Sequence, residues 1–208
     1  IYRVKLGNTK KNSSEKIYEF NGIGANISGL SAYGNNLFFM TSEYEDEAGN
    51  GYNTEANILN IHTSEVRKIA DASFASYIND EYVYFENNTT EVNRVNINTN
   101  EEEFFCNIDG PAYISADSNY IYFDNRQKMY TDESFKDRKI SVYDKSGKFI
   151  TEVIPKNPKD DCYFGGDDIM IFKETVTGEV TESDGLKNFY VLDKSQLTLP
   201  DKVFTDLK

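Results

Sequence analysis

Acidic side chains gather in one stretch of the sequence, between two apolar segments. Residues 42–55 contain no lysine or arginine, and their acidic residues are Glu43, Glu45, Asp46, Glu47 and Glu55. Calcium binds about six to eight oxygen atoms, many from carboxylates, so this cluster is a candidate calcium site. However, the segment EYEDEAGNG (43–51) lacks the DxDxDG spacing of an EF-hand loop. Two interpretations therefore stay open: a calcium site, or an acidic surface that attracts a basic protein or peptide.

A second acidic segment and several loop tyrosines extend this candidate surface. Residues 174–187 contain four acidic residues and a single lysine, Lys187. Tyrosine often anchors interfaces, because its large ring can be buried while its hydroxyl stays hydrated. The predicted ligand-binding residues are Tyr44, Glu45, Asp46, Glu47, Tyr52, Tyr130 and Asp184.

Residue types needed for nucleophilic catalysis are scarce. His62 is the only histidine and falls in a predicted turn. A serine or cysteine nucleophile would need it as the base, and the GxSxG motif is absent. Cys106 and Cys162 are the only cysteines; without CxxC spacing, they are predicted to be unpaired buried thiols. The sequence therefore favours a non-catalytic protein with no cofactor other than a possible calcium ion.

A carboxylate pair for glycoside cleavage remains the alternative, because the separation it needs is a property of the folded protein. Asp117, Asp167 and Asp168 are available, but Asn35 and Asp80 occupy the same repeat positions, which favours a turn role. The alternative function is a calcium-assisted hydrolase or lyase that acts on polysaccharide.

Charge and hydropathy exclude two classes of partner. The formal net charge is −13 and the sequence pI is about 4.6, so the chain would repel a nucleic-acid backbone. No run approaches the roughly 18 apolar residues of a membrane span. We therefore predict no nucleic-acid ligand and no membrane span, and a protein or glycan partner.

Two short phrases recur along the chain. The first is a turn followed by an apolar strand that ends in Phe: GNNLFF (34–39), DEYVYF (80–85), SNYIYF (118–123) and DDIMIF (167–172). The second follows about twenty residues later: ILNIHTSE (58–65), RVNINTNE (94–101), SVYDKSGK (141–148) and YVLDKSQL (190–197). Residues 2–9, YRVKLGNT, are a fifth copy of the second phrase.

These phrases predict a four-stranded antiparallel unit of roughly 40 to 50 residues, which the composition supports through its 29 Tyr and Phe residues. Continuous apolar residues in one strand indicate burial on both faces, as in the stacked blades of a β-propeller. The predicted fold is all-β, a partial or open propeller with a half blade (1–22) and four blades (about 23–72, 73–110, 111–160 and 161–208). A β-sandwich or linear β-solenoid is the alternative.

The strand count predicts an unpaired edge near Ile1 to Leu6. The chain begins with the third and fourth strands of a blade, and no half blade remains at its other end to complete them. We expect a piece of a larger propeller of about six to eight blades with a missing N-terminal segment, or an edge that pairs with another chain.

The phrases also resemble a known family. Three segments are similar to the strands of a bacterial propeller family of unknown function: Ile1-Tyr2-Arg3-Val4-Lys5-Leu6, a weaker copy of it at residues 93–97, and residues 120–123. That family is related to the low-density-lipoprotein-receptor (YWTD-like) type. The chain departs from it in having no YWTD-like tetrapeptide and no Trp. The resemblance implies a non-catalytic, secreted or cell-surface bacterial protein and supplies no site residues.

Overall fold

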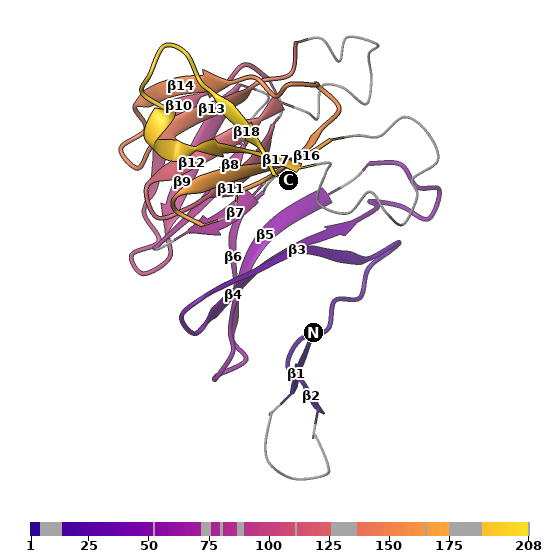
Figure 1. Ribbon diagram of the computed structural model, residues 1–208. Coiled ribbons are helices and arrows are strands. Elements are labelled where there is room, and N and C mark those ends of the chain that lie inside the picture. Colours follow the sequence, from indigo (N-terminus) through magenta and orange to yellow (C-terminus); the bar gives the residue numbers. More distant parts are fainter. Residues whose placement is uncertain are drawn as a thin grey trace, which may run out of the picture. The chain divides into compact units, whose positions relative to one another are not determined.

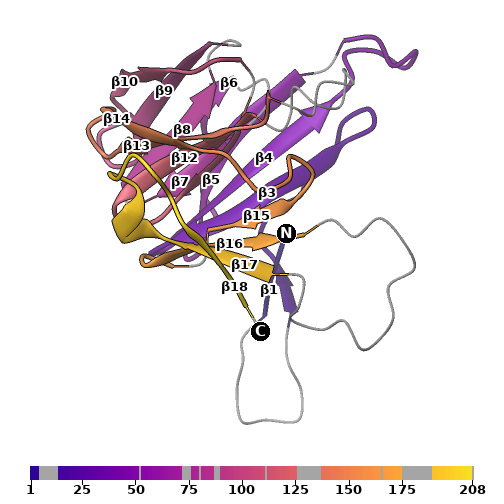
Figure 2. The same ribbon diagram turned by 45° about the horizontal axis from the view of Figure 1, so that its top comes forward.

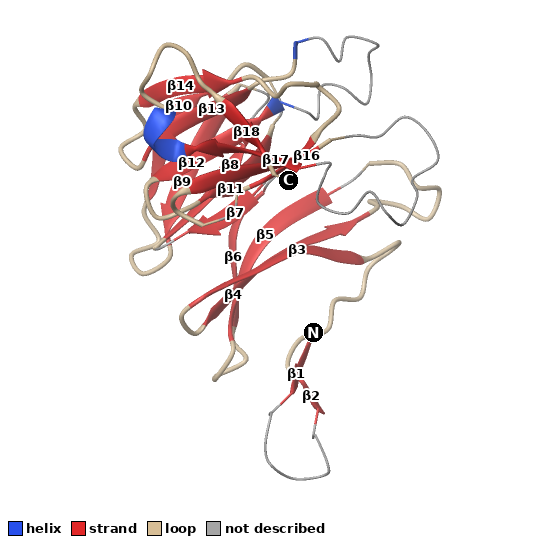
Figure 3. Ribbon diagram, viewed as in Figure 1, coloured by secondary structure: helices blue, strands red, loops and turns tan. Residues whose placement is uncertain are grey.

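The computed structural model describes residues 1–4, 14–51, 53–71, 76–79, 81–86, 90–110, 112–125, 137–164, 166–174 and 189–207. In these ranges the chain is all-β, as predicted, and all its sheets are built from antiparallel strands (Figure 3). No α-helix occurs in them; η4 (Lys194–Gln196) is a short 3-10 helix. No helix in the described ranges is long and apolar enough to cross a membrane.

The strands form one two-stranded sheet and four four-stranded sheets in the described chain (Figures 1 and 2). The first two sheets are β1 (Tyr2–Val4) with β2 (Ser14–Lys16), and β3 (Asn26–Tyr33), β4 (Asn36–Glu43), β5 (Asn53–Asn60) and β6 (Val66–Asp71). The third contains β7 (Ser76–Asn79), β8 (Tyr82–Glu86), β9 (Glu91–Asn96) and β10 (Glu102–Asn107).

The last two sheets continue the same order. One contains β11 (Tyr113–Ala116), β12 (Tyr120–Asp124), β13 (Ile140–Asp144) and β14 (Phe149–Val153). The other contains β15 (Asp161–Tyr163), β16 (Ile169–Lys173), β17 (Phe189–Asp193) and β18 (Phe204–Asp206). Within each sheet, neighbouring strands are also neighbours in sequence, which makes the fold propeller-like.

Contacts divide the chain into two compact units. Unit 1 is Ile1–Asn88 with Asn93–Glu103, and unit 2 is Thr89–Val92 with Phe104–Lys208. In unit 1, Phe38 and Phe39 are both fully buried but belong to different cores. Phe38 packs with Val83 and Phe85, whereas Phe39 packs with Ile17 and Leu59. The prediction that the apolar triplet is buried on both faces is confirmed at this strand.

Unit 2 has a core of its own, built from the sheets β11–β14 and β15–β18. Tyr122, Val142 and Met170 are fully buried in it. Phe172 and Tyr190, on neighbouring strands, stack with ring centroids 4.9 Å apart. The aromatic residues of the repeat therefore serve packing, as the sequence predicts.

One turn chemistry recurs where the third strand of each four-stranded sheet ends. The side-chain oxygens of Asn60, Asn96, Asp144 and Asp193 each accept a hydrogen bond from the backbone N–H two residues later, at 2.8–2.9 Å. Asn and Asp favour such turns because their short side chains mimic a backbone carbonyl. His62 lies in the first of these turns, as predicted, where Nε2 is 3.1 Å from Asn35 Oδ1.

Neither cysteine forms a disulfide, but the prediction that both are buried is wrong for Cys162. Cys106 is buried, and burial raises the pKa of its thiol to about 12, whereas Cys162 is only half-buried. Only the thiolate reacts quickly with alkylating reagents. We expect iodoacetamide at pH about 8 to label Cys162 in the folded protein and Cys106 only after unfolding, as peptide mass mapping would show. Equal labelling of both thiols without denaturant would contradict this expectation.

Candidate functional site

An acidic pocket of about 260 Å³ lies in unit 1, on one face of the sheet β3–β6. The pairing of three strands brings its lining residues side by side. Thr41 on β4 pairs with Glu55 on β5, which pairs with Asp71 on β6. Two residues along, Glu43 pairs with Asn53. Because cross-strand partners and alternate residues share a face, these side chains project from the same side of the sheet.

Lys68 lies among the three carboxylates of this pocket. Its Nζ is 2.7 Å from Glu55 Oε1 and 2.6 Å from Asp71 Oδ1, and these carboxylates raise the pKa of the ammonium. Glu43 makes no ion pair within the described part of the chain. The pocket therefore holds three carboxylates and one lysine, and a net negative charge.

The segment that follows β2 forms the pocket's apolar wall. Phe20 lines the pocket, and the Tyr18 ring packs at a tilt against Phe39, with ring centroids 4.8 Å apart. Burial, with the nearby Glu55 carboxylate, raises the pKa of the Tyr18 hydroxyl. A Cβ on Gly22 would lie 1.8 Å from Glu43 Oε2, so the absence of a side chain at Gly22 lets the Glu43 carboxylate lie over the backbone.

The acidic loop beside this pocket is closed by Asp46. Its Oδ1 accepts the backbone N–H of Asn50 and its Oδ2 accepts the Asn50 side-chain amide, each at 2.9 Å. These bonds lower the pKa of the Asp46 carboxyl. Gly49 and Gly51 have φ of +78° and +67°, values that favour glycine. Asp46 thus holds the shape of the loop, a role that the sequence analysis did not assign to it.

The structure places four of the predicted ligand-binding residues in this loop. Tyr44, Glu45, Asp46 and Glu47 are all exposed next to the pocket, and the Tyr44 backbone N–H donates to Ile23 O at 2.9 Å. The Tyr44 ring lies over Gly24, whose φ is +63°. Tyr52, Tyr130 and Asp184 lie outside the described residues.

Sequence reasoning did not assign Thr41, Asn53, Lys68 and Asp71 to a site. Their alignment depends on register between β4, β5 and β6, and a β-bulge between Ala56 and Asn57 shifts Lys68 opposite Asn57. One signal in the sequence could have found part of the pocket. Aligning the two repeat phrases as antiparallel strands places Thr41 opposite Glu55. In the described ranges, no three His, Cys, Asp or Glu residues converge closely enough to hold a metal ion.

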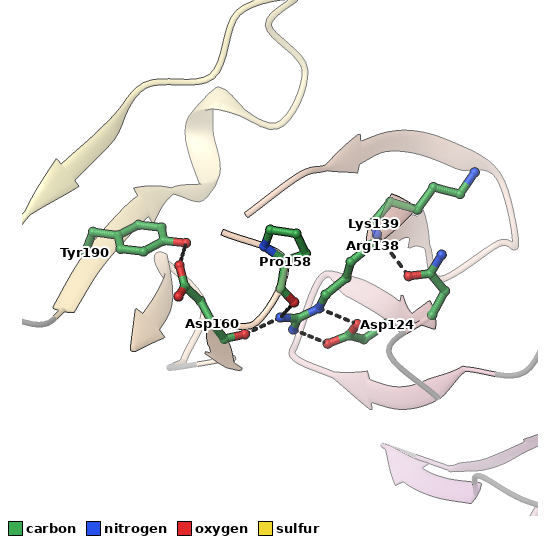
Figure 4. Close-up of polar contacts among 7 residues, drawn as sticks. Asp124, Arg138, Lys139, Pro158, Asp160 and Tyr190 are labelled. Atoms are coloured by element: carbon green, nitrogen blue, oxygen red, sulfur yellow. Dashed lines mark hydrogen bonds and ion pairs between the residues drawn. The ribbon is translucent and has the colours of Figure 1, made fainter. Parts of the chain in front are cut away.

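Unit 2 contains a buried arginine cluster (Figure 4). Arg138, whose side chain is fully buried, donates to both carboxylate oxygens of Asp124, at 3.0 and 2.6 Å. Its third nitrogen donates to the carbonyls of Pro158 and Asp160. The Tyr190 hydroxyl donates to Asp160 Oδ2 at 2.8 Å. The cluster ties the loop before β15 to the β12–β13 pair.

A second buried pair in unit 2 joins hairpin turns. The Lys194 ammonium donates to Asp117 and to the carbonyl of Gly166, and both members of the ion pair are almost fully buried. Asp117 also accepts the Tyr122 hydroxyl and two backbone N–H groups of its own turn. Its predicted turn role is confirmed, and its burial with Lys194 leaves little access for a polysaccharide.

Comparison with known proteins shows the fold alone. The sequence matches no protein-family profile and no curated protein. Acylaminoacyl peptidase from Pyrococcus horikoshii is 16% identical over 81% of this chain and 31% of that one, with a TM-score of 0.59. An oligogalacturonate lyase in complex with manganese is 13% identical over 84% of this chain and 49% of that one, with a TM-score of 0.52.

An oligogalacturonate lyase from Vibrio parahaemolyticus is also similar, with 13% identity over 82% of this chain and 48% of that one, and a TM-score of 0.50. The chain thus spans between about a third and about half the length of these solved structures. They are propeller-like enzymes, which agrees with the repeated four-stranded sheets.

Proposed function

We propose that this chain is a non-catalytic propeller binding module that takes a lysine or arginine side chain of a protein or peptide partner in the acidic pocket. The observation that carries the proposal is the pocket's composition: Glu43, Glu55 and Asp71 face a single Lys68. A ligand cation would bind Glu43, the carboxylate that Lys68 does not neutralise. The net charge of −13 would speed the approach of a basic partner.

The wall of the pocket suits the rest of such a side chain. Lysine and arginine bury their methylene stems on apolar surface while the charged group stays polar. Phe20 offers that surface, and Asn53 and Thr41 offer hydrogen-bonding groups around the cation. Tyr44 and Glu47, exposed on the adjacent loop, would contact the residues on either side of the bound one.

An NMR titration with N-acetyl-arginine amide tests this proposal, with N-acetyl-citrulline amide as its uncharged match. We expect arginine, not citrulline, to shift the amide signals of Glu43, Glu55 and Lys68. Glu43→Gln should weaken binding about three- to fivefold, as expected for one partly exposed ion pair. Glu81→Gln removes the same charge from an exposed turn residue and should leave binding unchanged. Equal losses in the two variants, or equal shifts with citrulline, would overturn the proposal.

The second candidate is a calcium-assisted hydrolase or lyase that acts on polysaccharide. The similarity to a peptidase and to oligogalacturonate lyases supports it, although their activities belong to those proteins. Incubation with polygalacturonate and millimolar calcium, followed by an assay for new reducing ends or unsaturated products, tests it. Product formation that chelator abolishes would replace the binding module by the enzyme.

The architecture carries a related proposal. The sheets are blades of an open propeller, with β1–β2 as a half blade at 1–22 and four blades at about 23–72, 73–110, 111–160 and 161–208. The ring to which they belong would hold about six to eight blades. We further propose kinship with the YWTD-like bacterial family and a secreted or cell-surface location, which rest on the repeat phrases.

A further inference from the structure

Two Asn-Gly steps border the acidic pocket and its loop, at residues 21–22 and 50–51. Asparagine is a chemically labile residue, and it loses its side-chain ammonia most readily before glycine. Glycine has no Cβ to hinder the approach of its backbone nitrogen to the side-chain carbonyl carbon of the asparagine. From the sequence alone, the two steps should react alike. The structure separates them by what each asparagine side chain contacts.

Asn50 is held in place by three hydrogen bonds. Its side-chain amide donates to Asp46 Oδ2 and its backbone N–H to Asp46 Oδ1, each at 2.9 Å, and its carbonyl accepts the Glu45 N–H at 3.2 Å. Closing a ring onto the Gly51 nitrogen rotates the side chain away from Asp46. Hydrogen bonds to a charged group are strong, so this restraint should slow the reaction at Asn50 at least about tenfold.

Asn21 has no such restraint. Its side chain is exposed and makes no hydrogen bond to a residue that the structure describes, and the Gly22 N–H donates to no described group. The Glu43 carboxylate lies over Gly22, where a Cβ would be 1.8 Å from Glu43 Oε2. Gly51 has the Glu45 carboxylate in a similar place, at 2.4 Å. The restraint on the asparagine is therefore what distinguishes the two steps.

We propose that Asn21 is a site of spontaneous deamidation, and that the product strengthens the binding of a cation in the acidic pocket. The Gly22 nitrogen forms a bond to the Asn21 side-chain carbonyl carbon, and the bond from that carbon to the amide nitrogen breaks. Ammonia leaves with the proton that the Gly22 nitrogen gives up, and a cyclic succinimide remains. Water then opens the ring at either carbonyl, which gives aspartate or isoaspartate. Water is consumed and ammonia released, with no oxidation or reduction.

Both products place a new carboxylate beside the pocket. Residue 21 lies between Phe20, which lines the pocket, and Gly22, which lies under the Glu43 carboxylate. The pocket already holds more carboxylates than ammonium groups, so the added charge increases its attraction for a cation. Salt screens this gain, because residue 21 is exposed. The gain in affinity rests on the proposed function, whereas the reaction at Asn21 does not.

Peptide mass mapping after incubation in mildly alkaline buffer measures the reaction at both sites. In urea, where neither side chain is restrained, Asn21 and Asn50 should deamidate at similar rates. In the folded protein, we expect Asn21 to react at least about tenfold faster than Asn50. Asp46→Ser removes the acceptor of the Asn50 amide and should bring the Asn50 rate close to that of Asn21. Glu47→Gln, in the same loop, leaves Asp46 in place and should change neither rate.

Circular dichroism would check that Asp46→Ser folds, and the wild type compared with and without urea gives an independent measurement. Similar rates at the two sites in the folded wild type would overturn the proposal. A folded Asp46→Ser variant in which Asn50 stays protected would overturn it as well.

Asn21→Asp carries the charge of the products and tests the effect on binding. We expect it to bind N-acetyl-arginine amide about two- to threefold more tightly than the wild type does, a gain that disappears at high salt. Asn98→Asp, in an exposed turn of unit 1, adds the same charge and should leave the affinity unchanged. Equal affinities of wild type and Asn21→Asp, or an equal gain in Asn98→Asp, would overturn the effect on the pocket. Failure of all three proteins to bind arginine would instead overturn the proposed function, and mass mapping would still decide the reaction at Asn21.

Discussion

Arg138→Met should lower the free energy of unfolding by about 3–5 kcal/mol, because it leaves the Asp124 carboxylate buried without its cation. The same change removes the donor of the Pro158 and Asp160 carbonyls. Methionine keeps much of the volume, so a cavity contributes little to the loss. Urea unfolding, followed by the fluorescence of the tyrosines, measures the effect.

Lys139→Met is the matched control for this variant. Lys139 is the next residue, and its ammonium is 2.7 Å from Glu152 and 3.7 Å from Asp109 near the surface. Exposed ion pairs contribute about 0–1 kcal/mol, so the control should be nearly as stable as the wild type. Asp124→Leu added to Arg138→Met should recover part of the loss, since an apolar pair can replace a buried ion pair. Similar losses of unfolding free energy in Arg138→Met and Lys139→Met would show that the buried arginine cluster stabilises the protein no more than an exposed ion pair does.

Lys194→Met is expected to cost about 3 kcal/mol or more at neutral pH, for a related reason. The variant leaves the almost fully buried Asp117 carboxylate without the ammonium that neutralises it. Lys148→Met, at an exposed position of the same unit, should change stability by less than about 0.5 kcal/mol. Thermal unfolding of the three proteins in one buffer makes the comparison.

The pH dependence of this second variant distinguishes a buried charge pair from simple loss of packing. Burial alone would raise the pKa of the Asp117 carboxyl, but hydrogen bonds from Lys194 and Tyr122 outweigh it and hold the pKa below its usual value. A lowered folded-state pKa stabilises the protein above the unfolded pKa of about 4, and the gain disappears as pH falls through the folded pKa.

In Lys194→Met, burial is no longer outweighed by the ammonium, so the Asp117 carboxyl should take up its proton at a higher pH. The stability difference between wild type and variant should therefore be largest near pH 7 and shrink below about pH 5. Unfolding curves at several pH values would show this. A difference that stays constant down to about pH 3 would assign the loss to packing instead of charge.

The repeat phrases predicted the strands because each combines two local signals. Asn35, Asp117 and their equivalents mark turns, and the apolar triplets behind them form strands that are buried on both faces, as Phe38 and Phe39 show. Such signals act over a few residues and can be read without the fold. The acidity of residues 43–47 was visible for the same reason.

The polar clusters could not be predicted in this way. Lys194 and Asp117 are 77 residues apart, and Arg138 reaches the Asp160 carbonyl 22 residues away. Asp71 and Lys68 join the pocket only through pairing of β5 with β6 and the bulge between those strands. These contacts depend on register and stacking, which a pattern of residue types does not specify.

The order of strands within each sheet has a consequence for synthesis of the chain. Because every four-stranded sheet consists of consecutive strands, the ribosome releases all four before the first strand of the next sheet emerges. Because the entropy cost of closing a loop grows only slowly with its length, each sheet can collapse in turn during translation. Arg138 and Asp124 both belong to the segment that forms the sheet β11–β14, so their ion pair can form as soon as that sheet does. Asp117, by contrast, can be neutralised only after β17 of the next sheet has emerged, because Lys194 directly follows that strand.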